Sequence, residues 1–128
     1  MDRMACAPYL RRMTPGARTP EELDTILEDA FVSRDRALSR ALFEDHAVLV
    51  KAGGVEARGT EAIGHALAEL WARDCTYVAR TARVLQARDT ALLVSSAATH
   101  VLRRSGDGTW RAAISLLQLD TSIRREDT

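Results

Sequence analysis

Hydrophobic residues recur at helical spacing soon after residue 19 of this chain. Between residues 20 and 34 they occupy positions i, i+3, i+4, i+7 and i+8, the stripe that an amphipathic helix buries. The stripe consists of Leu23, Ile26, Leu27, Ala30 and Phe31, and the polar side is expected to carry Asp24, Glu28, Asp29 and Arg34. Thr19 can cap the helix, Pro20 suits its first position, and Glu22 holds the reciprocal position of a capping box. The pattern therefore predicts a helix that begins at Pro20.

Two further helices are predicted from the same spacing. A short helix begins near Asp35 and buries Leu38, Ala41 and Leu42. A longer helix, with Thr60 as its cap, carries an apolar stripe of Ile63, Ala66, Leu67, Leu70 and Trp71. Each stripe needs a sheet to cover it.

The intervening segments are rich in β-branched and aliphatic residues, as is typical of strands. A strand is expected over residues 45–51, followed by a turn at Gly53 and Gly54 and a short return strand over 55–58. Three longer antiparallel strands are expected in succession over residues 76–86, 91–103 and 109–119. The order of elements predicts a helical layer and a mostly antiparallel sheet that can curl around it to leave a cavity.

The dipeptide Asp107-Gly108 is a hairpin signal before the last strand. If these residues are the centre of the turn, residue 105 faces residue 110, and His100 lies directly opposite Ser115. The face that carries His100 then holds small side chains that leave room for a ligand: Ser96, Ala98, Ala113 and Ser115. The opposite face holds Thr99, Val101, Ile114 and Leu116. Because that face would expose an apolar patch, we expect a homodimer packed through the sheet.

The length of 128 residues fits one domain with a core of its own. Residues 1–18 lack periodicity and contain Pro8, Pro15 and Gly16, so we expect a flexible N-terminal tail there. The folded domain is expected over residues 19–122, and a charged C-terminal end over 123–128.

The charge balance of the chain argues against two classes of partner. With 18 basic and 18 acidic residues, the chain lacks the positive field that nucleic acids and anionic membranes attract. No stretch approaches the length of a membrane span, and the N-terminal segment has no apolar run of signal-peptide length. Cys6 and Cys75 are too few and too far apart for a metal or redox motif. We therefore expect a cytoplasmic protein with no nucleic-acid or membrane partner.

Three segments resemble those of a known superfamily. LFEDHAVLV with the Gly-rich turn after it, then RGTEAIGHAL, and finally GDGTWRAAI stand in the order found in nuclear transport factor 2-like proteins. Within that superfamily the chain looks most similar to the polyketide cyclase (SnoaL-like) and ketosteroid-isomerase-like branch, over nearly all residues after Thr19. The resemblance implies an α+β, cone-shaped barrel in which a curved, mostly antiparallel sheet wraps around three helices of the N-terminal half. It also implies a pocket between helices and sheet, and a homodimer packed through the sheet.

The same resemblance argues against one activity. The general-base Asp of ketosteroid isomerases would fall at about Lys51, and the Tyr that donates to the enolate would fall near Leu27. Residues 91–101 contain no carboxylate that an apolar site could hold protonated. A ketosteroid isomerase is therefore not expected.

His100 is the candidate catalytic residue, because it is the only ionisable side chain between Asp89 and Arg103 and faces small residues. Its imidazole could act as a general acid or base near pH 7, or it could be structural and hydrogen-bonded to a neighbour such as Ser115. Lys51 also has two interpretations. It is either a partly desolvated base or Schiff-base lysine in the pocket, or a side chain that reaches water beside a turn.

The other candidate ligand-binding residues are Phe31, Trp71, Tyr77, Ser96 and Ser115. The two helical aromatic residues line the pocket or fill the core, the tyrosine offers a hydroxyl to the cavity mouth, and the serines share the face of the histidine.

The remaining histidines do not indicate a metal site. His46 is expected to follow a helix end, where a cation is favourable, and His65 is expected to be solvated. A metal needs three or four converging ligands, so neither a metal nor any other cofactor is predicted.

Two functions remain open. In the first, the protein is a small-molecule-binding pocket protein whose ligand is hydrophobic or polycyclic. In the second, it is a cofactor-independent enzyme of the cyclase, isomerase or hydratase type that uses His100 as its general acid or base. The number of converging polar groups distinguishes these two functions, because an enzyme needs at least two titratable or donor groups within reach of one substrate atom. A dimerisation domain with a filled cone is a third possibility.

Overall fold

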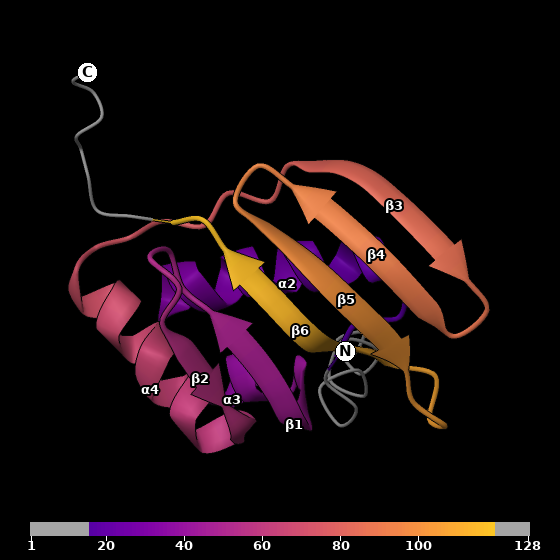
Figure 1. Cartoon of the computed structure of the whole chain (residues 1–128), viewed down its shortest axis with the longest axis horizontal. Coiled ribbons are helices and arrows are strands. Elements are labelled where there is room, and N and C mark those ends of the chain that lie inside the picture. Colours follow the sequence, from indigo (N-terminus) through magenta and orange to yellow (C-terminus); the bar gives the residue numbers. More distant parts are fainter. Residues whose placement is uncertain (1–15, 120–128) are drawn as a thin grey trace, which may run out of the picture.

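A computed structural model describes residues 16–119, which form three helices and a six-stranded sheet (Figure 1). The helices are α2 (Pro20–Ser33), α3 (Arg36–Arg40) and α4 (Gly59–Ala72). The strands are β1 (Phe43–Val50), β2 (Glu56–Arg58), β3 (Thr81–Ala87), β4 (Thr90–Ser95), β5 (Ala98–Arg104) and β6 (Trp110–Leu117).

The sheet runs in the order β2-β1-β6-β5-β4-β3, so that β2 and β3 are its two edges. Neighbouring strands are antiparallel except β1 and β6, which are parallel. The sheet is curved and does not close into a barrel, with α2 behind its middle strands and α4 beside β1 and β2 (Figure 1). The predicted fold class, an α+β protein with a curved, mostly antiparallel sheet around three helices, is confirmed.

Helix α2 starts where its capping residues predict. The Thr19 side chain accepts a hydrogen bond of 3.2 Å from the Glu22 N–H, and Pro20 is the first helical residue. The Glu22 carboxylate accepts from the N–H of Arg18 at 2.7 Å, one residue before the partner that a capping box expects. Because Arg34 adopts a left-handed conformation (φ 54°), the helix ends there.

The predicted strand over 91–103 is wrong, because it is two strands. β4 and β5 are joined by a tight turn at Ser96 and Ala97 and pair antiparallel, with Leu93 opposite His100. The turn carries no Gly, Pro, Asn or Asp, the strongest turn formers, and Ser96 is its one residue of a type that favours turns. Ser95 helps to close it, since its hydroxyl donates to the carbonyl of Ala98 at 3.3 Å.

Other boundaries also differ from the sequence prediction. β1 begins at Phe43, so His46 lies inside an exposed stretch of strand and follows no helix end. Thr60 lies within α4, whose N-cap is Arg58 without a side-chain hydrogen bond. The strand expected from residue 76 begins only at Thr81.

The pairing of His100 with Ser115 is confirmed, although the turn that predicted it is wrong. At the hairpin, Arg104 faces Trp110, because the Ser105 N–H bonds to the Thr109 carbonyl at 2.8 Å and closes a longer loop. An irregularity between Val101 and Leu102 then shifts the register by one residue and restores the predicted pair.

The same shift changes which small residues face inward. Ala112 is fully buried, whereas Ala113, expected on the face of His100, is only half-buried. Ala98 is buried as expected. On the outer face Ile114 and Leu116 are 44% and 43% exposed, in agreement with the predicted direction of that face.

The core fills the space between the helices and the concave face. Fully buried side chains from both layers meet there: Leu23, Leu27, Leu49, Ile63, Leu67, Leu93 and Leu102. Ala17 is also buried, and its carbonyl accepts from the Trp110 N–H at 2.8 Å. The domain limits at 19 and 122 and the two terminal segments stay predictions, since most of those termini lies outside the described residues.

Candidate functional site

Five of the seven residues predicted for the site meet in one buried cluster between helices and sheet. Phe31 lies at its centre, with ring centroids 5.9 Å from Trp71 and 5.4 Å from Tyr77. His100 follows at 6.3 Å from the Tyr77 ring and contacts Ser115 across β5 and β6. All five are at most 6% exposed.

The polar atoms of this cluster form a connected series of hydrogen bonds, which we call the buried polar chain: Asp24, Tyr77, His100 and Ser115. The Tyr77 hydroxyl bonds to the Asp24 carboxyl and lies 2.9 Å from His100 Nε2. His100 Nδ1 lies 2.7 Å from Ser115 Oγ. Thr81 donates to the second carboxyl oxygen of Asp24 at 3.0 Å.

These contacts define the tautomer of the histidine. A tyrosine hydroxyl has one proton, so if it donates to Asp24, its oxygen must accept from His100 Nε2. Nδ1 is then the acceptor of the ring and accepts a hydrogen bond from the Ser115 hydroxyl.

Burial keeps this histidine neutral. Desolvation of the fully buried ring lowers the pKa of His100 to about 4, and no opposing cause raises it. Burial raises the pKa of Tyr77, with the hydrogen bond to Asp24 as the second cause. At pH 7 the two rings are therefore uncharged, and His100 can accept a proton only at a cost.

Asp24 was missed by the sequence analysis, which wrongly placed it on the solvent side of its helix. It is fully buried. The signal was present, because Pro20, Asp24, Leu27 and Phe31 recur at spacings of four, three and four and share one helical face. Two hydroxyl donors offset the burial of its carboxyl group.

Ser96 and Lys51 lie outside the cluster. Ser96 is exposed in the turn between β4 and β5, because the strand that would have carried it inward ends at Ser95. Lys51 directly follows β1, and its Nζ lies 2.8 Å from Glu69 Oε1 on α4.

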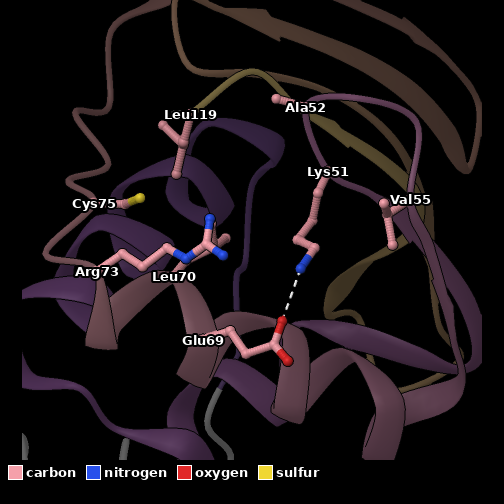
Figure 2. A pocket seen from close by; sticks show the side chains of 8 residues that line it. All are labelled: Lys51, Ala52, Val55, Glu69, Leu70, Arg73, Cys75 and Leu119. Carbon is pink, nitrogen blue, oxygen red and sulfur yellow. Dashed lines mark hydrogen bonds and ion pairs between the residues drawn. The ribbon is translucent and has the colours of Figure 1, made fainter. Parts of the chain in front are cut away.

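Lys51 borders an open hollow of about 250 Å³, which we call the Lys51 hollow (Figure 2). It is lined by Lys51, Ala52, Val55, Glu69, Leu70, Arg73, Cys75 and Leu119. The turn after β1, the last turn of α4 with the residues that follow it, and the segment after β6 supply these residues. Neither His100 nor Tyr77 lines it, so the predicted site residues divide between a closed cluster and an open hollow.

Two cations and one carboxylate face this hollow. Figure 2 shows the Arg73 side chain extending across it from the end of α4, on the side opposite Lys51. The hydrogen bond and charge of Lys51 lower the pKa of Glu69, and the charges of Arg73 and His65 add to the effect. Glu69 and Arg73 were not singled out in the sequence, because their role depends on how the turn after β1 packs over α4.

A second hollow of about 320 Å³ lies along β2 and α4, and we call it the β2 hollow. It shares Lys51, Val55 and Glu69 with the Lys51 hollow, so the ion pair stands on the border of both. His65, which lies one helical turn before Glu69, lines only this second hollow.

Neither a metal-binding group nor a membrane-spanning helix occurs among the described residues. Among residues 16–119, no three His, Cys, Asp or Glu side chains are grouped so that they could hold a metal ion. No helix in that part of the chain is long and apolar enough to cross a membrane.

Comparison with known proteins identifies the fold. No protein-family model and no curated protein matches the sequence. A ketosteroid isomerase-like protein from Erwinia carotovora superposes with a TM-score of 0.64 at 20% identity, over 77% of this chain and 92% of that chain. A nuclear transport factor 2-like protein with a cystatin-like fold from Novosphingobium aromaticivorans gives a TM-score of 0.59 at 22% identity, over 99% and 97% of the two chains. A nuclear transport factor 2-like protein of unknown function from Pseudomonas putida gives 0.57 at 17% identity, over 80% and 85%.

The chain therefore has the nuclear transport factor 2-like, cystatin-like fold, as its sequence motifs predicted. These similarities do not distinguish the polyketide cyclase branch, which stays a prediction. The same fold carries many activities, so function has to be argued from the site.

Proposed function

We propose that the protein binds a small, largely apolar molecule in the Lys51 hollow. The observation that carries this proposal is an open hollow with the apolar walls Val55, Leu70 and Leu119 and a few charged heads at its border. Small-molecule sites have this composition, because apolar walls supply affinity and a few polar groups fix orientation.

The volume limits the ligand. A hollow of about 250 Å³ corresponds to roughly eight water molecules at about 30 Å³ each, which suits one ring with a short substituent. A polycyclic ligand would have to extend past the Lys51–Glu69 pair into the β2 hollow.

The test fills the hollow without touching the core. Val55 is 58% exposed at its border, so Val55→Trp should leave the fold intact and occupy the space. Val32→Trp is the matched control, because Val32 is 78% exposed on α2 and lines neither hollow. We expect uncharged single-ring fragments to shift the amide resonances of Ala52 and Leu70 in the unchanged protein and in Val32→Trp, but not in Val55→Trp. Equal binding to all three proteins would refute the proposal.

A second candidate function is cofactor-independent acid–base catalysis at the buried polar chain. The specific observation in its favour is that Tyr77 joins the Asp24 carboxyl to the His100 imidazole, so two titratable groups converge on one hydroxyl. The buried Nε1 of Trp71 also has no hydrogen-bond partner among the described residues, and it could donate to a bound substrate. In this reaction the substrate would displace the Tyr77 hydroxyl. His100 would then carry its ring proton on Nδ1, so that Nε2 could accept a proton from the substrate.

The two candidate functions are distinguished by whether the fragments that bind also react. A binding protein leaves them unchanged in D₂O. An enzyme exchanges or eliminates a C–H proton, and His100→Gln, which keeps a hydrogen-bonding side chain, should slow the reaction roughly 100-fold or more. An unchanged rate in His100→Gln would exclude this second function.

The protein is also proposed to form a homodimer through the outer face of the sheet. Ile114 and Leu116 on β6 are nearly half exposed there, and an apolar depression of about 270 Å³ lies over Leu85, Leu92 and Val101. A second copy would remove these side chains from water.

A further inference from the structure

The chemistry of the Lys51 hollow points to one class of ligand. We propose that it takes a small carboxylic acid, whose carboxylate replaces Glu69 as the partner of Lys51 while Arg73 closes on its other side. This inference rests on the proposed binding function and adds the charge and head group of the ligand.

The two partners of the Lys51–Glu69 ion pair differ in their exposure to solvent. The Lys51 side chain is 21% exposed, whereas the Glu69 side chain is 66% exposed. Ion pairs with an exposed partner contribute little to stability, so Glu69 can rotate toward solvent with a small loss. The Lys51 side chain is the less exposed partner and borders both hollows, so it remains as a cation of the Lys51 hollow when Glu69 turns away.

A displaced Glu69 would still have a polar partner nearby. His65 lies one helical turn before it on α4 and lines the β2 hollow. The β2 hollow also provides the space, because Glu69 lines both hollows.

Arg73 supplies the second contact. Its guanidinium makes no hydrogen bond or ion pair within residues 16–119, and Figure 2 shows it facing the Lys51 hollow. A planar guanidinium binds a carboxylate through two parallel hydrogen bonds. With Glu69 turned away, the two cations leave a net positive site that favours an anionic ligand over a neutral one of the same shape.

The rest of the ligand should be short and apolar. Val55, Leu70 and Leu119 form the walls beyond the charged border, and the volume admits one ring or a short chain. An aryl-substituted short-chain acid meets both requirements, and phenylacetate is the probe with that shape.

The experiment compares phenylacetate with phenylacetamide, which has the same shape and no charge. Binding is followed through the amide resonances of Ala52 and Leu70. In protein labelled with [¹³C]lysine, the Cε–Hε signal of Lys51 reports on the cation itself, because Lys51 is the only lysine of the chain. We expect the acid to bind roughly tenfold or more tightly than the amide, as charge-assisted hydrogen bonds supply.

Three substitutions test the role of each charged residue in binding the acid. Lys51→Met and Arg73→Gln should each weaken acid binding about tenfold and leave the amide unchanged. Glu69→Gln should tighten acid binding by about twofold to fivefold, because it removes the internal competitor. Arg103→Gln is the control, since Arg103 pairs with Glu44 and lines neither hollow. It should change nothing.

The outcomes separate this inference from the binding function. Equal affinities for acid and amide would overturn the carboxylate inference and leave small-molecule binding in place. Weaker acid binding in Glu69→Gln, or competition by inorganic phosphate as strong as by the acid, would also overturn it. Failure of the acid and of every uncharged fragment to shift Ala52 and Leu70 would remove both proposals.

Discussion

Replacing Tyr77 by Phe removes the central hydroxyl of the buried polar chain and little else. The ring keeps its place against Phe31, at a centroid distance of 5.4 Å. The hydroxyl is the acceptor for His100 and a donor to Asp24, so one substitution leaves a buried N–H and a buried carboxyl oxygen without that partner. Both residues are fully buried, and water cannot replace the lost bonds without opening the core.

The expected loss of stability follows from these two groups. An unsatisfied buried polar group costs about 1–3 kcal/mol, so Tyr77→Phe should lower the free energy of unfolding by about 2–6 kcal/mol. For a domain of about 100 residues, each kcal/mol lowers the Tm by about 4 °C, so a fall of at least about 8 °C is expected. Urea denaturation at pH 7 and a thermal scan measure both quantities.

Thr81→Val is the matched control for this prediction. It removes the other donor to Asp24, but Thr81 is exposed at the start of β3, where water can take its place. Its loss should be about 1 kcal/mol or less. If Tyr77→Phe proved as stable as Thr81→Val, the Tyr77 hydroxyl would not connect Asp24 and His100 in the buried polar chain. The tautomer assigned to His100 would then lose its basis.

Three further predictions follow from the same structure. Because the pKa of His100 falls from its ordinary 6.5 to about 4 on folding, the unfolded chain binds the extra proton between these values. Stability should therefore fall by about 2 kcal/mol more between pH 7 and pH 5 in the unchanged protein than in His100→Gln, measured by urea denaturation; equal losses would contradict the burial of a neutral ring. Lys51→Met should raise the pKa of Glu69 toward its ordinary value, because the hydrogen bond to Lys51 is the main cause of its lowering, and a ¹³C carboxyl titration that found no change would disprove this pairing. Light scattering should give the mass of a dimer, and replacing both Ile114 and Leu116 by Arg should give a monomer with unchanged helix content; a monomer before substitution would count against the homodimer.

Local signals in the sequence predicted the helices well. Thr19, Pro20 and Glu22 act within one helical turn, so their effect does not depend on the rest of the fold. The turn at Ser96 and Ala97 could not be found in this way, because it is held by strand pairing and carries no Gly, Pro, Asn or Asp.

The candidate site was predicted only in part for a similar reason. The cross-strand pair of His100 and Ser115 follows from strand alternation, and it survived because one irregularity offset an error in the turn. Asp24 was assigned by its charge to solvent, although its helical position is on the buried face. The Lys51 hollow depends on contacts between α4, the turn after β1 and the segment after β6, which no local pattern encodes.

A crystal structure of the protein soaked with uncharged single-ring fragments and with phenylacetate tests the central claim most directly. The account predicts ligand density in the Lys51 hollow, against Val55, Leu70 and Leu119, in the unchanged protein and not in Val55→Trp. Density that instead replaces Tyr77 beside His100, or an empty Lys51 hollow at saturating ligand, would contradict it.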